Sequence, residues 1–171
     1  MSLVTRATSS DPDAWAALYR RAYPGLIAYA SRRLDRERAS DAVGETMARA
    51  LAKIDRFEWK GGGFDAWLYG ILRHVGIDAH RARSRDAERR EREDPRAAGP
   101  LDHVVDNEDA AEVRAAFGRL GNDDRELLEL RVVAGLTAED VGKVLGKRPG
   151  AVRMAQARAL ERLRRELERG S

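Results

Sequence analysis

The basic residues near the end of the chain have the type and spacing that most clearly indicate binding chemistry. Between Lys147 and Arg165 the sequence has seven basic residues and one acidic residue, Glu161. A helix with such one-sided charge can bind a polyanion, because lysine and arginine neutralise phosphates. The same charges can also form a solvated surface that pairs with nearby acids. Charge alone therefore leaves both interpretations open.

Two short helices joined by a turn are predicted in the segment that carries these charges, "GLTAEDVGKVLGKRPGAVRMAQARALERLRREL" (135–167). Thr137 is suited to cap the first helix, Gly146 to end it, and Pro149 to begin the second. Two helices joined by a short turn that contains glycine form a helix-turn-helix, whose second helix enters the major groove of DNA. This pattern favours the polyanion interpretation.

The second of these helices has one face that can pack and one that can bind. Its apolar residues recur at steps of three and four and form a packing stripe of Val152, Ala155, Ala159 and Leu163. Arginine can hold guanine or phosphate, and small residues permit close approach of the backbone. We therefore expect the outward positions to contact DNA: Arg148, Ala151, Arg153, Met154, Ala157 and Arg158.

Composition excludes several other kinds of site. The chain has no cysteine, so disulfides, thiolate metal sites and cysteine catalysis are excluded. Its three histidines, His74, His80 and His103, are scattered, and no nucleophile stands beside a base. We expect no enzyme activity, no cofactor and no metal. No apolar run is long enough to span a bilayer and no signal peptide is recognisable, so we expect a cytoplasmic protein.

The distribution of charge predicts two units. Residues 1–85 carry 15 basic and 10 acidic groups, residues 86–108 carry 4 and 8, and residues 109–171 carry 13 and 11. Two mildly basic ends on an acidic middle fit two polyanion-binding units joined by a tether. The expected divisions are a disordered lead at 1–10, a helical domain at 11–83, a flexible linker at 84–108 and the helix-turn-helix domain at 109–171.

The first domain is expected to be helical throughout. Asp11 can cap a first helix that begins at Pro12, and Pro24 is expected to kink or split it. Two further helices are predicted over 40–54 and from about residue 65, separated by the glycine-rich break "EWKGGG" at 58–63.

The second domain adds another predicted helix, which ends at Gly135 and carries Leu127, Leu128, Leu130 and Val132. No stretch alternates apolar and polar residues as a half-buried strand does. The predicted fold class is all-α, with two small helical domains.

Two further motifs, taken with the terminal one, resemble a known family. "SDAVGETMARAL" (40–51), "GGFDAWLYGILRHVGIDAHR" (62–81), a charged linker and the helix-turn-helix resemble the extracytoplasmic-function (group IV) sigma factors of bacteria. The resemblance extends from about Asp13 to Leu167. It implies a region 2-like domain, which binds core RNA polymerase and the −10 element, and a region 4-like domain, which binds the −35 element. It also implies promoter opening and transcription initiation.

The resemblance assigns the polymerase contact to an acidic helix. The family pattern Asp-Leu-Val-Gln-Glu-Thr, which docks on the clamp helices, matches positions in 41–46, where Ala42 and Gly44 depart from it. Gly44 costs up to ~1 kcal/mol of helix stability. The matching residues implied to bind polymerase are Asp41, Val43, Glu45, Thr46 and Met47. A contact with the polymerase flap is implied as well, and an anti-sigma protein is a further expected partner.

The loop at 58–63 and the helix after it match the region that captures the −10 strand. Holding an unstacked base requires a pocket, a basic approach and often an aromatic surface. The residues expected to contact −10 DNA are Lys60, Gly62, Phe64, Asp65, Arg73, His74, Asp78 and Arg81. The family commonly has Arg-Asn where this chain has Arg73–His74.

The recognition helix also departs from the family. Its "GAVRMA" (150–155) stands where Gly-Thr-Val-Lys-Ser-Arg is usual, and Gln156 replaces a large aliphatic residue. These changes predict a −35 preference unlike that of the common members. The linker is either a passive tether or, by resemblance, a segment that threads near the polymerase cleft.

Two alternatives remain open at this point. A helix-turn-helix transcription regulator would bind duplex DNA tightly without being a polymerase subunit. An RNA-binding or protein-interaction module would tolerate scrambling of the terminal basic helix better than promoter recognition would.

Overall fold

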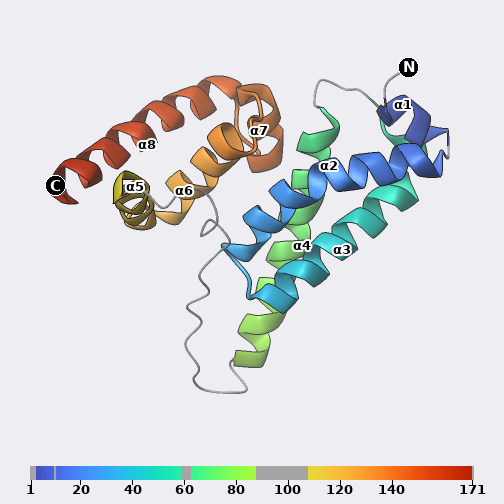
Figure 1. Cartoon of the computed structure of the whole chain (residues 1–171), viewed down its shortest axis with the longest axis horizontal. Coiled ribbons are helices and arrows are strands. Elements are labelled where there is room, and N and C mark those ends of the chain that lie inside the picture. Colours follow the sequence, from blue (N-terminus) through green and yellow to red (C-terminus); the bar gives the residue numbers. More distant parts are fainter. Residues whose placement is uncertain (1–2, 10, 59–62, 88–107, 171) are drawn as a thin grey trace. The chain divides into compact units, whose positions relative to one another are not determined.

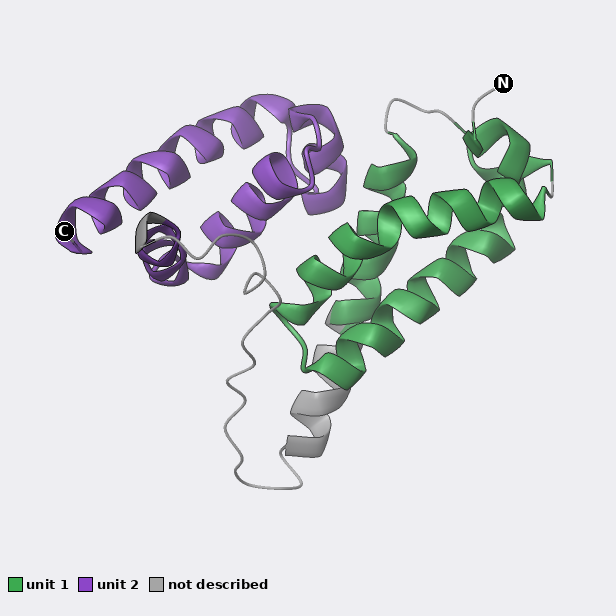
Figure 2. Ribbon diagram, viewed as in Figure 1, with its two compact units in different colours: residues 1–100 green, residues 101–171 purple. Residues whose placement is uncertain are grey.

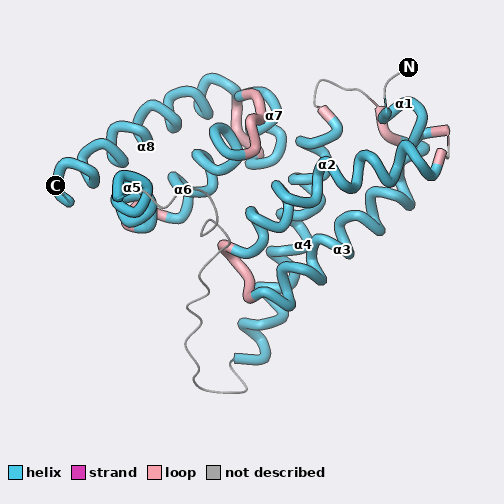
Figure 3. The backbone as a smooth tube through the Cα atoms, in the orientation of Figure 1, coloured by secondary structure: helices cyan, strands magenta, loops and turns pink. Residues whose placement is uncertain are grey.

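The computed structural model describes residues 3–9, 11–58, 63–87 and 108–170, with the backbone alone at 77, 79–87 and 108–109. Within these ranges every regular element is helical (Figures 1 and 3), which confirms the predicted all-α class. The chain forms two compact units, 1–100 and 101–171 (Figure 2). No helix in the described ranges combines the length and apolar character needed to cross a bilayer.

The first unit is built on three long helices that pack against one another. They are α2 (Pro12–Ser31), α3 (Arg36–Lys53) and α4 (Phe64–Ala87). Each contributes fully buried apolar side chains, among them Leu18 and Leu26, Val43, and Leu68 and Leu72. Burial of each such side chain contributes roughly 1.5–3 kcal/mol. This core holds the surfaces of α3 and α4 in fixed positions within the unit.

The start of α2 follows the predicted capping. The Asp11 carboxylate accepts hydrogen bonds from the N–H groups of Asp13 and Ala14, at 3.0 and 3.1 Å. The bond from Ala14, followed by that from the Arg6 side chain, lowers the pKa of Asp11 below its ordinary value. Pro24 lies inside α2, which continues through it, so of the two expected outcomes, a kink or a split, the split does not occur. Buried Leu18 and Leu26 on either side of Pro24 hold the two halves on one core.

The expected disordered lead was also wrong. Residues Leu3–Thr8 form a short helix, α1, which packs on α2 and on the 3₁₀ turn η1 (Ile54–Arg56). Val4 and Ala7 are its buried residues. A helix this short is unstable in isolation, so its packing on the bundle stabilises it.

Two other boundaries differ from the predicted ones. Asp35 caps α3 through its Oδ1, which accepts from the Arg38 N–H at 2.9 Å, so this helix begins before the predicted residue 40. Helix α4 continues through Ala87, into the segment expected as a linker. Residues 88–107 of that linker lie outside the described residues.

The second unit is assembled around its C-terminal helix. Helix α8 (Pro149–Gly170) packs against α5 (Glu108–Gly118), α6 (Asn122–Leu128) and α7 (Ala138–Leu145). Its core includes Leu120, Leu128 and Ala159, with Phe117 and Leu163 packed against them. Ion pairs at 2.9 and 2.7 Å join Arg119 to Glu166 and Arg162 to Asp124.

A π-helical turn, η3 (Glu129–Val133), follows α6 and changes which side chains are buried. Val132, an apolar residue of the predicted helix, is 63% exposed, whereas Glu129 is 4% exposed. The wider π turn shifts the angular position of each residue relative to an α-helix. The π turn therefore places the Glu129 side chain inside and the Val132 side chain outside.

Candidate functional site

The turn between α7 and α8 has the geometry that a helix-turn-helix requires. The Thr137 hydroxyl accepts from the Asp140 N–H at 3.1 Å, which confirms the predicted cap of α7. Gly146 has a φ of 67° and donates its N–H to the Gly142 carbonyl, and the Lys147 N–H reaches the same oxygen at 2.7 Å. A Cβ on Gly142 would lie 2.5 Å from the Lys147 oxygen, so only glycine fits this close approach.

Helix α8 presents the two faces that the sequence predicted. Val152 and Ala159 are fully buried, and Ala155 and Leu163 are half-buried. The six positions expected to face outward are all exposed: Arg148, Ala151, Arg153, Met154, Ala157 and Arg158. Small side chains alternate with arginines on this face, so a partner can approach the helix backbone between positive charges.

Arg153 differs from the other two arginines of this face. Its Nη2 and Nη1 lie 3.2 and 3.5 Å from Glu139 Oε1, on the first turn of α7. In the described part of the chain, Arg148 and Arg158 form no ion pair. The pairing of Arg153 was not anticipated, because a contact between helices leaves no signal in the spacing of either one.

A second cross-helix contact also holds α8 in place. Arg131, on η3, donates from Nε to the Gln156 amide oxygen at 2.7 Å, and its Nη1 donates to the Leu136 carbonyl. Gln156 stands where the resembled family has a large aliphatic residue. Here it connects α8 to the segment before α7, so a polar contact takes the place of an apolar one.

On α3 the expected polymerase-binding residues divide into exposed and buried. Asp41 and Glu45 are exposed one turn apart, and Arg49 pairs with Glu45 at 2.6 Å. Val43, Thr46 and Met47 are buried, which removes their side chains from any direct contact with a partner. Their role is to hold α3 on the bundle, and the acids remain as the accessible charges.

The start of α4 lies in a cluster of aromatic rings. Phe64 packs edge-on against Phe57 and Trp15, with ring centroids at 5.7 and 6.5 Å, and lies 5.7 Å from Trp67. Phe64 is 2% exposed, so its ring is not available for the expected contact with −10 DNA. The cluster instead anchors the two ends of the segment 58–63. Lys60 and Gly62 lie outside the described residues.

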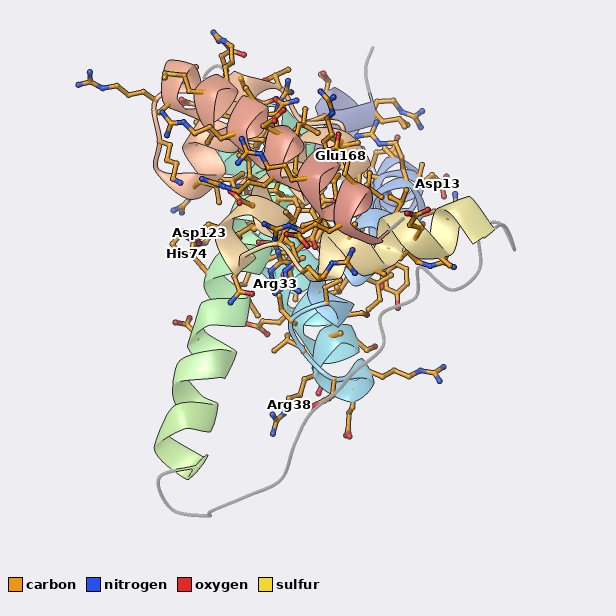
Figure 4. The ribbon with its side chains drawn as sticks, turned by 90° about the vertical axis from the view of Figure 1, so that its left-hand side faces the viewer. Asp13, Arg33, Arg38, His74, Asp123 and Glu168 are labelled. Atoms are coloured by element: carbon orange, nitrogen blue, oxygen red, sulfur yellow. The ribbon has the colours of Figure 1, made fainter. Side chains whose placement is uncertain are left out.

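The remaining candidates lie along α4. Asp65 pairs with Arg21 of α2 at 3.1 Å, a contact between helices that the sequence did not indicate. Arg73 is half-buried, whereas Asp78 is exposed. His74, which is labelled in Figure 4, is exposed as well. The side chain of Arg81 lies outside the described residues. Of the α4 residues expected to contact −10 DNA, His74 and Asp78 are therefore the ones whose side chains are both described and exposed.

Two family models match the chain, one in each unit. Sigma-70 region 2 matches residues 18–86, and Sigma-70, region 4 matches residues 116–165. The first range covers most of α2, all of α3 and nearly all of α4, and the second covers α6, α7 and most of α8.

Whole-chain relatives agree with these matches. The chain is 36% identical to the ECF RNA polymerase sigma factor ShbA of Streptomyces griseus, over 95% of this chain and 92% of that protein. It is 33% identical to the ECF RNA polymerase sigma factor SigD of Mycobacterium tuberculosis, over 97% of this chain and 82% of that protein.

Solved structures share the architecture. The sigma factor RpoE in its complex with the anti-sigma factor NepR from Bartonella quintana has a TM-score of 0.71 at 28% identity, over 90% of this chain and 96% of that one. CnrH, in complex with the cytosolic domain of CnrY, has the same fold, with a TM-score of 0.68 over 99% of this chain and 97% of that one.

Proposed function

The chain belongs to the extracytoplasmic-function RNA polymerase sigma factors, and from this premise we propose how its exposed surfaces divide the work of initiation. As an alternative sigma factor it works with core RNA polymerase at promoter DNA. We assign core binding to Asp41 and Glu45 of α3. We assign −35 recognition to α8 and −10 recognition to the segment from Lys60 to Arg81.

The observation that supports this division is the opposite charge of two exposed faces in separate units. Asp41 and Glu45 present carboxylates on α3, whereas Arg148 in the turn and Arg153 and Arg158 on α8 present guanidinium groups. Carboxylates attract a basic protein partner and repel nucleic acid. Guanidinium groups can hold phosphates and guanine edges. Each face therefore suits one of the two partners of a sigma factor.

The segment that we propose to bind −10 DNA is held by an aromatic cluster. The aromatic cluster of Phe57, Phe64 and Trp67 holds both ends of the segment 58–63, and we assign direct DNA contact to Lys60 and to the glycine backbone at residue 62. We also assign −10 contacts to Arg73, His74 and Asp78 of α4 and, on the motif match alone, to Arg81. Asp65 and Phe64 position the segment, since one is paired with Arg21 and the other is buried.

Location and regulation follow from the same function. Core polymerase and promoters lie in the bacterial cytoplasm, where we place this protein. It acts by binding, without catalysing a reaction. The similar RpoE was solved with the anti-sigma factor NepR, and on that basis we propose that an anti-sigma protein sequesters this chain.

Two substitutions test these assignments, one expected to weaken core binding and the other expected to weaken promoter recognition alone. Glu45→Lys should reduce association with core polymerase roughly tenfold or more, because a charge attracted to the partner becomes one that is repelled. Arg153→Ala should leave that association unchanged but reduce transcription from cognate promoters roughly 5- to 100-fold, since a bidentate base contact contributes about 1–3 kcal/mol of discrimination. Association is measured with labelled core enzyme, and transcription by run-off assay.

Matched controls are available on the distal part of α8. Glu168→Lys makes the same charge change as Glu45→Lys, and Arg164→Ala the same truncation as Arg153→Ala; these two residues pair with each other at the surface. Both controls should behave as wild type. Weakened core binding in Arg153→Ala, or unchanged core binding in Glu45→Lys, would contradict the assignment.

A helix-turn-helix regulator that acts without polymerase would behave differently. It would bind its duplex site tightly as a free protein, and added core enzyme would not change the site. The sigma factor assignment predicts weak binding of the free chain to promoter DNA and sequence-specific binding with core polymerase.

A further inference from the structure

We propose that Glu139 is a specificity-determining residue that orients the Arg153 guanidinium toward a guanine at one position of the −35 element. The same carboxylate lowers the affinity of this face for DNA of any sequence. The inference rests on the proposed −35 function of α8, and it assigns a role to a residue of α7, outside the recognition helix.

The geometry places Glu139 where it can fix the direction of the Arg153 side chain. Both terminal nitrogens of Arg153 approach a single carboxylate oxygen, at 3.2 and 3.5 Å. A guanidinium has five N–H donors in a rigid planar fork, so two directed at Glu139 leave others for the O6 and N7 acceptors of a guanine. The planar group cannot turn about its own axis while both contacts persist.

The backbone position of Glu139 is determined by the fold. It lies in the first turn of α7, which begins at the Thr137 cap and ends at the left-handed Gly146. Close approach at Gly142 fixes the turn that leads into α8. Carboxylate and guanidinium are therefore held by two helices whose relative placement is set by backbone contacts.

Contrast with the neighbouring arginines supports the assignment. Arg148 and Arg158 are exposed on the same face and form no ion pair within the described residues. Long, unrestrained side chains suit phosphates, which accept from many directions. A base edge must be met in one orientation, and a side chain that is already oriented loses less entropy on binding. Arg153 is the arginine of this face that has such restraint.

Because the ion pair of Arg153 and Glu139 is exposed, it can orient a side chain while contributing little to the stability of the fold. The side chains of Arg153 and Glu139 are 56% and 54% exposed. Ion pairs this exposed contribute little to the free energy of unfolding. Glu139 also places a negative charge beside a surface that must meet phosphates, which weakens binding to any DNA sequence. The combined result is lower general affinity and higher discrimination at one base.

The test compares Glu139→Gln with Glu161→Gln, which removes the same charge from an exposed residue of α8 that pairs with Arg165. Each variant is assembled with core polymerase and used in transcription from a promoter pool with a randomised −35 element. Arg153→Ala first identifies the position where guanine preference is lost. Thermal unfolding of each variant controls for folding.

Glu139→Gln should lower guanine preference at that position about three- to tenfold, a substantial part of what one bidentate contact supplies. Affinity for DNA without a promoter should rise severalfold, and the midpoint of unfolding should be that of wild type. The double variant with Arg153→Ala should show no further loss of guanine preference beyond Arg153→Ala alone. Glu161→Gln should keep the full preference.

Two results would overturn the inference, and they are distinguishable. If Arg153→Ala changes base preference at one position but Glu139→Gln leaves it intact, the positioning role fails while the −35 function of α8 stands. If Arg153→Ala changes no position at all, the proposed function of α8 fails, and the role of Glu139 fails with it.

Discussion

The helices proposed to bind polymerase and promoter each hold a functional charge in an ion pair, but the pairs are built differently. Glu45 pairs with Arg49 one turn along the same helix, at 2.6 Å. Arg153 pairs with Glu139 on a different helix. A pair within one helix keeps its geometry wherever that helix moves. A pair between helices depends on the turn that joins them, so the geometry of the turn becomes part of recognition.

The two helices also differ in what holds their binding residues in place. On α3 the neighbours of Asp41 and Glu45 that face inward, Val43 and Thr46, are buried in a long bundle, and the outer face is a solvated surface. On α8 the binding residues directly follow a tight turn closed by Gly142 and Gly146. We therefore expect the promoter-binding face to be sensitive to backbone changes that the polymerase-binding face tolerates.

Gly142→Ala should have the largest effect, because it disturbs the turn that positions the promoter-binding face of the second unit. The added Cβ would lie 2.5 Å from the Lys147 carbonyl oxygen, so backbone must shift. Crowding of this kind costs typically about 1–3 kcal/mol. We expect a lower unfolding midpoint in differential scanning calorimetry, and transcription that depends less on the −35 element. Wild-type values for both would show that the turn is not rigid.

Gly44→Ala should have a smaller effect of opposite sign. No atom lies within 4 Å of a Cβ built on Gly44, which is exposed on α3. Alanine in a helix interior is more stable than glycine by roughly 0.8–1 kcal/mol. The free energy of unfolding from urea titration should rise by about this amount. Stability unchanged or reduced would show that the added methyl group is not accommodated in open space at this position.

Arg49→Ala should have the smallest effect. Exposed pairs one helical turn apart contribute about 0.3–0.5 kcal/mol, so stability should change by no more than this. Removal of Arg49 leaves Glu45 free for the polymerase, and association with core enzyme should strengthen up to about twofold at low salt. Association weakened severalfold would instead place Arg49 itself in the contact.

Local features of the fold could be predicted from the sequence, because their causes are local. The caps at Asp11 and Thr137 and the helix end at Gly146 depend on a few adjacent residues, and all three were predicted. The two faces of α8 follow from the spacing of Val152 and Ala159. The outward positions of its arginines were therefore predictable as well, although their DNA contacts stay a prediction.

Features that depend on tertiary packing could not be predicted in the same way. Helix α1 is stabilised by Val4 and Ala7 against the bundle, and six residues have too little periodicity to reveal it. The π turn at Glu129–Val133 shifts the helical period within a single turn. Pairs between helices, such as Arg153 with Glu139, join residues whose separation in sequence has no helical meaning.

Run-off transcription with purified core RNA polymerase over a genomic promoter library tests the central claim most directly. We expect that adding this chain directs core enzyme to a new set of start sites, which share sequence elements near −10 and −35. The same start sites with and without the chain would contradict it.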